Sequence, residues 1–174
     1  MTETYAIDRE NGNTQFGDAI KEGMDKIKGT MRIYNGNINM LKGYQETTSH
    51  IIFDIKLGES LRRKARFVGN GHKTVTPSSV TYSSMVSRDL ARIILMIAAL
   101  NEFEIEVTDI ENTYLTAQCR EKIWMYGGVE FGDLEGEILI VKKALYGLKS
   151  SGAAFSAFLA KTIDQMGIIS SVAD

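Results

Sequence analysis

The sequence contains very little cysteine or proline, the residues that most often mark a disulfide-linked or turn-rich chain. Its 174 residues include one cysteine, Cys119, and one proline, Pro77. A single cysteine excludes an internal disulfide, so Cys119 is interpreted as an ordinary small residue. No run of about 18 apolar residues occurs, which excludes a membrane-spanning helix of ordinary length. An apolar content of 44% and a charged content of 24% are typical of one soluble globular domain with a hydrophobic core.

The sequence also lacks a strong net charge and the common catalytic motifs. A net charge of −2 gives no overall basic field, so nucleic-acid binding would need a local basic patch. There is no glycine-rich phosphate loop, no Ser-His-Asp pattern and no Cys/His cluster, and His72 has no partner at metal-ligand spacing. The first thirteen residues are polar and acidic, unlike a secretory signal or an arginine-rich transit peptide. The compartment is therefore unknown.

The central stretch 103–117, FEIEVTDIENTYLTA, organises the chain. Apolar and polar residues alternate over 103–108, which predicts a half-buried strand. Asp109 follows with the parity of the apolar residues, so it is expected to point inward, where a carboxylate needs a partner or a cation. Two interpretations stay open on this stretch alone. Asp109 either caps the following turn or binds a metal ion at a phosphoryl-transfer site.

Periodicity elsewhere predicts an α+β fold with a mainly antiparallel sheet packed by helices on one face. We expect a loose N-terminal arm over residues 1–13 and a helix from Gln15 to Lys28, capped by Asn13 or Thr14 and stopped by Gly29. A helix capped by Ser87 spans 88–101 and is expected to be the best-buried helix. A last helix, capped by Ser151, runs to Met166, and Gly167 ends it. The other predicted strands are 31–34, 50–57, 61–68, 121–126 and 137–143.

The strands at 50–57 and 61–68 form a predicted hairpin that turns at Gly58-Glu59-Ser60. Its returning arm carries a group of cations that includes Arg63, Lys64 and Arg66. Lysine and arginine commonly protect a solvated edge strand, which is one interpretation. The other is an arm that grips phosphates.

Four stretches closely resemble the copia-type retrotransposon reverse transcriptases in content, order and spacing. They are KARFVGNGH (64–72), TYSSMVSRDLARIILMIAALNEFEIEVTDIENTYLTA (81–117), EKIWMYGGVEFG (121–132) and KKALYGLKSSGAAF (142–155). The likeness runs from about Thr14 to Asp174. It implies a single partial reverse-transcriptase-like domain over 14–174, with the fingers at about 14–85 and part of the palm at about 86–174.

The resemblance implies roles for eight residues. Asp109 matches the first catalytic aspartate, which holds magnesium. Tyr114 matches the residue that distinguishes deoxyribose from ribose. The other six match residues that contact the incoming nucleotide, its triphosphate or the template: Arg63, Lys64, Arg66, Tyr146, Gly147 and Lys149.

The chain departs from the family pattern in its acidic residues. The family has a Tyr-x-Asp-Asp segment downstream, whereas this sequence contains no Asp-Asp pair. A centre of two magnesium ions needs several convergent carboxylates, so we expect a truncated reverse transcriptase that is inactive alone and does not bind magnesium stably. The alternative is a non-catalytic structural or interaction subunit recruited from a retroelement. A protein partner that covers an exposed sheet edge or helix face is expected in either case, with weaker nucleic-acid binding.

Overall fold

The computed structural model describes residues 2–56, 62–78, 81–83 and 86–168, and it has the expected α+β composition. The α-helices are α1 (Thr2–Glu10), α2 (Gln15–Ile27), α3 (Arg88–Leu100), α4 (Thr113–Thr116) and α5 (Ser151–Gln165). The strands are β1 (Met31–Ile33), β2 (Gln45–Glu46), β3 (Ser49–Lys56), β4 (Arg62–Gly69), β5 (Ile123–Tyr126) and β6 (Ile138–Val141). Three 3₁₀ turns are η1 (Ile38–Met40), η2 (Gly71–Lys73) and η3 (Val129–Leu134).

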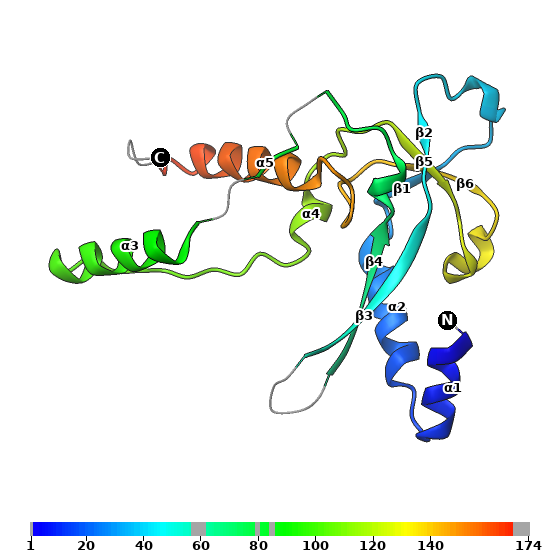
Figure 1. The fold of residues 1–174 in the computed structure, drawn as a ribbon, viewed down its shortest axis with the longest axis horizontal. Helices are drawn as coiled ribbons and strands as arrows, with labels where there is room; N and C mark the ends of the chain where they lie inside the picture. The colour runs from blue at the N-terminus through cyan, green and yellow to red at the C-terminus, as the bar shows by residue number, and fades with distance from the viewer. Residues whose placement is uncertain (1, 57–61, 79–80, 84–85, 169–174) are drawn as a thin grey trace.

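The strands form a four-stranded sheet in the order β1-β6-β5-β2 and a separate hairpin of β3 and β4. The β1–β6 and β6–β5 pairs are antiparallel, and the short β2–β5 pair is parallel. In the hairpin, Ser49 pairs with Gly69 and Lys56 with Arg62. The predicted turn of this hairpin lies outside the described residues. Helix α2 packs along β4, so the hairpin and α2 form one arm of the molecule (Figure 1).

The main core lies where the four-stranded sheet meets the base of this arm. Ile123 and Met125 of β5 and Leu139 of β6 are completely or almost completely buried, together with Phe67 of β4 and Ile27 of α2. Burying such a side chain stabilises the folded state by about 1.5–3 kcal/mol. Packing at this junction therefore fixes the base of the arm relative to the sheet.

Residues 1–13 were expected to be a loose arm, and that prediction is wrong. Residues Thr2–Glu10 form α1, which packs against α2. Buried Asp8 accepts hydrogen bonds from the backbone N–H groups of Phe16 and Gly17 at 3.0 and 2.9 Å. These donors have no partner within the helix, so a carboxylate from outside caps α2. Asn13 contributes by accepting from Gln15 N, whereas the Thr14 side chain bonds Asp18 instead.

The predicted strand over 103–108 does not form. Residues Phe103–Ile110 have no strand assignment, and their apolar side chains are exposed, up to 93% for Val107. A strand is stable only when its backbone groups pair with a neighbour, and no described strand lies beside this segment. Asp109 is correspondingly exposed rather than turned inward.

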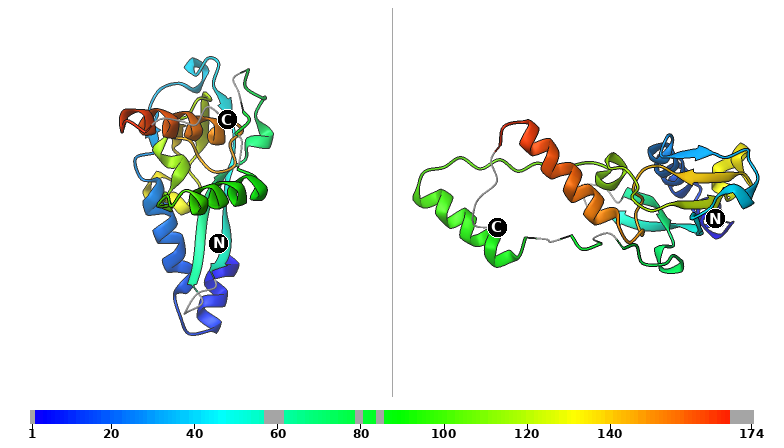
Figure 2. Two further views of the ribbon diagram at one scale, coloured as in Figure 1. Left: turned by 90° about the vertical axis from the view of Figure 1, so that its left-hand side faces the viewer. Right: turned by 90° about the horizontal axis from the view of Figure 1, so that it is seen from above.

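Helix α3 is present as predicted, but its expected burial is wrong. Ser87 Oγ accepts a hydrogen bond from Leu90 N at 3.1 Å, which confirms the cap. Ala98 is the one buried residue of α3, and the large apolar side chains of this helix are exposed. Figures 1 and 2 show α3 standing away from the sheet at the end of the extended segment that leads to α4. None of the helices in the described part of the chain is long and apolar enough to cross a bilayer.

Candidate functional site

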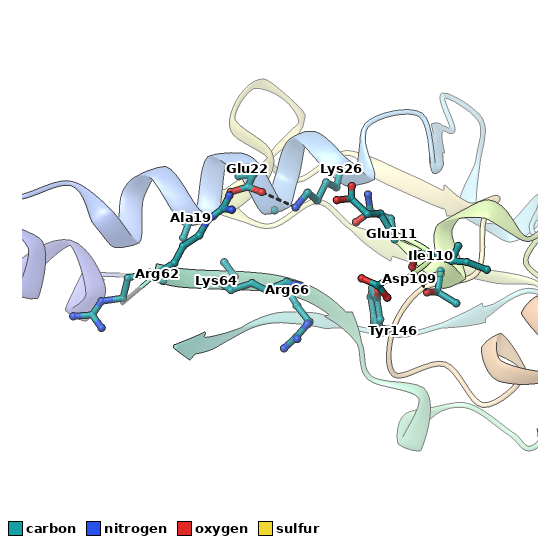
Figure 3. Close-up of a pocket in the computed structure, with 15 residues that line it drawn as sticks. Ala19, Glu22, Lys26, Arg62, Lys64, Arg66, Asp109, Ile110, Glu111 and Tyr146 are labelled. Atoms are coloured by element: carbon teal, nitrogen blue, oxygen red, sulfur yellow. Dashed lines mark hydrogen bonds and ion pairs between the residues drawn. The ribbon is translucent and has the colours of Figure 1, made fainter. Parts of the chain in front are cut away.

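A cavity of about 310 Å³ opens between α2, β4 and the segment that enters α4. Arg62 lies at one end, and Asp109, Glu111 and Tyr146 lie at the other (Figure 3). Its lining residues come from four parts of the sequence: Ala19, Glu22, Gly23, Lys26, Arg62, Arg63, Lys64, Ala65, Arg66, Asp109, Ile110, Glu111, Asn112, Thr113 and Tyr146. The cavity therefore contains five of the eight residues that the family resemblance implied.

Cations dominate the charge of this cavity. Five basic residues and three carboxylates line it, so the positive charge exceeds the negative charge by two. This is the local basic patch that a chain of net charge −2 needs in order to bind a phosphate group. The excess arises because four cations of β4 and Lys26 of α2 line the same cavity.

Glu22 of α2 holds two of these cations in place. Its carboxylate accepts from Lys26 Nζ at 2.7 Å and from Arg62 Nη2 at 2.8 Å. The hydrogen bonds from Lys26 and then Arg62 lower the pKa of Glu22. Glu22 thus ties the outer end of β4 to α2. Neither Glu22 nor Lys26 was identified from the sequence, although their spacing of four residues marks a helical ion pair.

Alternation along β4 separates the cations onto two faces. Arg63 shares the α2-facing side with buried Ala65, and its guanidinium carbon lies 4.6 Å from the centroid of the Phe16 ring. Its Nε is buried and has no hydrogen-bond acceptor among the described residues. Lys64 and Arg66 have the opposite parity, and Arg66 Nη1 lies 3.2 Å from Asp54 Oδ2. Arg63 is therefore partly a packing residue of the arm.

A tight turn delivers Asp109 and Glu111 to the cavity. Asn112 has a left-handed backbone with φ of +51°, a conformation that asparagine tolerates better than most residues. Thr113 Oγ1 donates to Ile110 O at 2.8 Å and closes the turn. Glu111 and Asn112 were not predicted as site residues. The sequence feature that could have identified them is Asn112 itself, a turn-forming residue that lies between Glu111 and the start of α4.

Three aromatic rings form a cluster with tilted and edge-to-face contacts behind this end of the cavity. The Tyr114 ring centroid lies 5.0 Å from that of Tyr146 and 6.3 Å from that of Phe155. Tyr146 lines the cavity, whereas Tyr114 lies outside its lining. Burial raises the pKa of the Tyr146 hydroxyl, and the charge of Arg66 opposes that effect. Tyr114 thus supports Tyr146 from behind.

Gly147 and Lys149 hold the loop that carries Tyr146 and do not line the cavity. Gly147 has a φ of +85°, and a Cβ there would lie 2.2 Å from the carbonyl oxygen of Gly69. Gly69 N donates to Tyr146 O at 2.8 Å, so the loop lies against the end of β4. Lys149 Nζ donates to the carbonyl oxygen of Thr74 and the hydroxyl of Thr76.

The acidic groups of the cavity do not fit a centre of two magnesium ions. No group of three or more His, Cys, Asp or Glu side chains is arranged for metal binding among the described residues. Asp109 and Glu111 line one end, but Glu22 is occupied by Lys26 and Arg62. Two ions about 4 Å apart need more oxygen ligands than this pair supplies. The excess of cations over carboxylates in the lining suits an anion instead.

Comparison with known proteins agrees with the sequence motifs. The family model described as reverse transcriptase (RNA-dependent DNA polymerase) matches residues 36–173. The chain is 28% identical over 121 residues to the retrovirus-related Pol polyprotein from transposon RE1 of Arabidopsis thaliana, and 26% identical over 121 residues to that from transposon RE2. Each alignment covers 67% of this chain and 8% of the relative.

No solved structure matches the chain significantly. The family match covers most of the chain, including the cavity residues from β4, from the turn before α4 and from the Tyr146 loop. The chain belongs to the copia-type branch of the reverse transcriptase (RNA-dependent DNA polymerase) family.

Proposed function

We propose that this chain is the nucleotide-binding portion of a copia-type reverse transcriptase and that the cavity between α2 and β4 holds the triphosphate of an incoming nucleotide. The observation that carries the proposal is that Lys26, Arg62, Arg63, Lys64 and Arg66 all line one cavity that also contains Asp109. A triphosphate carries several negative charges within a few ångströms, so it favours a site where cations come from two facing elements.

In this proposal the arm of α2, β3 and β4 is the fingers, within residues 14–85, and residues 86–174 contribute part of the palm. Tyr146 contacts the nucleotide directly, and Gly147 and Lys149 act by holding its loop against β4 and the 74–76 segment. Tyr114 influences the sugar position through its contact with the Tyr146 ring.

We further propose that the 174-residue chain does not polymerise by itself. Reverse transcriptases use divalent metal ions, and Asp109 is the first of the carboxylates that would hold them. Without two further convergent carboxylates, phosphoryl transfer loses most of its charge neutralisation. The test is primer extension by the purified chain on a primed RNA template with magnesium or manganese. Incorporation that Asp109→Ala abolishes would overturn this part of the proposal.

The binding proposal has its own test, which does not depend on catalysis. A fluorescent deoxynucleoside triphosphate is titrated with the chain at low salt, and its anisotropy gives the dissociation constant. The double variant Lys64→Ala/Arg66→Ala should weaken binding by about tenfold or more, because two charge-assisted contacts are lost. Lys161→Ala is the matched control, since Lys161 is an exposed cation on α5 away from the cavity. Equal affinities for all three proteins would refute a triphosphate site here.

The exposure of α3 favours a second candidate function, an interaction subunit that pairs with protein rather than nucleic acid. The large apolar side chains of α3 and of the following segment lie in solvent, which is unusual for an unpartnered soluble protein. The test is whether association of the chain with protein survives Lys64→Ala/Arg66→Ala and is lost on Ile93→Glu/Ile97→Glu. Association that depends on the β4 cations instead would argue for nucleic acid.

A further inference from the structure

Arg63 differs from the other arginines of β4 in what holds its side chain. Arg62 pairs with Glu22 at 2.8 Å. Arg66 pairs with Asp54 at 3.2 Å. Arg63 forms no ion pair with a carboxylate among the described residues, and its buried Nε has no acceptor there. An anion that enters the cavity lined by Arg63 therefore meets a positive charge that no carboxylate has neutralised.

The ring of Phe16 takes the place of a carboxylate beside Arg63. The guanidinium carbon of Arg63 lies over this ring, 4.6 Å from its centroid. An aromatic face attracts a cation and leaves its hydrogen-bond donors unused, because those donors lie in the plane of the guanidinium. A second ring, that of Phe53, meets Phe16 nearly at right angles with the centroids 5.4 Å apart. Phe16 can thus hold the side chain of Arg63 without cancelling its charge.

The N-terminal helix fixes the backbone that carries this ring. The buried carboxylate of Asp8 accepts from Phe16 N and Gly17 N at 3.0 and 2.9 Å. A Cβ at Gly17 would lie 3.2 Å from Cε1 of Tyr5, so α1 lies directly against the first turn of α2. Asp8 and Phe16 both precede residue 36, where the family match begins. Helix α1 therefore sets the start of α2 and, with it, the place of the Phe16 ring.

We propose that Phe16 is a positioning residue for the triphosphate, because its ring holds the guanidinium of Arg63 at the cavity and α1 sets that ring through Asp8. This inference rests on the proposed triphosphate site and names how one of its cations is held. A long side chain that is already ordered loses less rotamer freedom when a phosphate binds. Loss of the ring should therefore weaken triphosphate binding by about three- to fivefold.

A double-mutant cycle on Phe16 and Arg63 tests this role, with the anisotropy of a fluorescent deoxynucleoside triphosphate as the readout. Phe16→Leu keeps an apolar side chain but removes the aromatic face, and it should weaken binding by about three- to fivefold. Arg63→Ala should weaken binding by about tenfold. In the Arg63→Ala background, Phe16→Leu should cause no further loss, because the ring acts only through Arg63. Phe16→Tyr keeps the ring and should bind like the wild type.

Two controls separate this contact from the packing of the arm. Phe53→Leu removes the neighbouring ring of the same arm and should leave the affinity for the triphosphate unchanged. NMR of the protein without nucleotide reports the contact itself, because the Phe16 ring shifts the side-chain signals of Arg63. Phe16→Leu should remove that ring-current shift, and Phe16→Tyr should retain it. Phe16→Met, which also fills the site without a ring, replaces Phe16→Leu in every measurement if the leucine variant does not fold.

The outcomes distinguish this inference from the proposed function. Equal losses from Phe16→Leu with and without Arg63, or the same loss from Phe53→Leu, would mean that Phe16 acts through the packing of the arm. Unchanged affinity in Phe16→Leu would mean that the ring does not position Arg63. Either result overturns the inference and leaves the triphosphate site standing. Unchanged affinity in both Arg63→Ala and Lys64→Ala/Arg66→Ala would overturn the triphosphate site itself.

Discussion

The carboxylate of Glu121 accepts two hydrogen bonds from Ser150, one from the backbone N–H at 2.8 Å and one from the hydroxyl at 2.7 Å. Both residues are buried. Glu121 precedes β5, and Ser150 is the residue immediately before α5, so this contact anchors the start of α5 to a side chain from a distant part of the sequence. Because the Tyr146 loop lies immediately before α5, the same contact fixes one wall of the candidate cavity.

Replacing Glu121 should therefore destabilise the fold and loosen the cavity wall. Glu121→Ala removes Oε1, the oxygen that accepts both hydrogen bonds, and leaves the buried Ser150 groups unpaired, which should lower the free energy of unfolding by about 2 kcal/mol. Ser150→Ala removes only the hydroxyl bond and should cost about half as much. Urea denaturation followed by tryptophan fluorescence measures both. Wild-type stability in Glu121→Ala would show that water or another acceptor takes the place of the Glu121 carboxylate.

The backbone at Gly147 should not tolerate a side chain. Gly147→Ala forces a residue with Cβ into φ of +85° and brings that Cβ to 2.2 Å from Gly69 O and 2.6 Å from Val68 Cγ1. Strain and collision together should cost more than about 2 kcal/mol of stability.

Gly43→Ala is the matched control, because Gly43 has a φ of +76° but nothing within 4 Å of its Cβ position. Gly43→Ala should lower the free energy of unfolding by only about 1 kcal/mol, because it introduces backbone strain without a steric clash. Thermal unfolding distinguishes the two variants. Equal losses would mean that the loop yields and that the close approach to β4 is not required.

The thiol of Cys119 should be unreactive in the folded protein. Burial raises its pKa from 9.0 to about 11, so the thiolate fraction at pH 8 falls by about a hundredfold. The folded-state pKa lies above the unfolded value, so this group's contribution to stability is present below about pH 9 and is lost as the pH rises through 11. Alkylation by iodoacetamide at pH 8 should be at least a hundredfold slower in native protein than in urea. Similar rates would show that the site opens freely.

Acid should release the contact that Glu22 makes between α2 and β4. Its folded-state pKa lies below 4.5, the ordinary value of a glutamate, so its contribution to stability is present above that value and is lost as the pH falls through the folded-state pKa. NMR titration of the Glu22 carboxyl carbon measures the shift. In Lys26→Ala/Arg62→Ala the titration should move back toward 4.5, because both hydrogen-bond donors are gone. An unchanged midpoint would show that these cations do not contact Glu22 in solution.

Local periodicity predicted most of the individual elements correctly. Apolar residues at helical spacing identified α2, α3 and α5, alternation identified β3, β4 and β5, and a short apolar run identified β6. The same local signals failed for α1 and for the predicted strand over 103–108. A strand requires a partner strand, so alternation shows that Phe103 suits a sheet but not that a sheet is there to receive it. For the same reason, the predictions that Asp109 points inward and that α3 is the best-buried helix are both wrong.

The sequence by itself determined the family, the positions of most helices and strands, and the residues of β4 that supply positive charge. It did so because motifs, hydrophobic periods and turn residues act over a few neighbouring positions. Only the tertiary structure decided that Glu22 and Lys26 line one cavity with those cations, that Glu121 anchors the start of α5, and that α3 stands in solvent. These facts depend on contacts between residues 29 to 40 positions apart or on missing neighbours, and no local pattern encodes either.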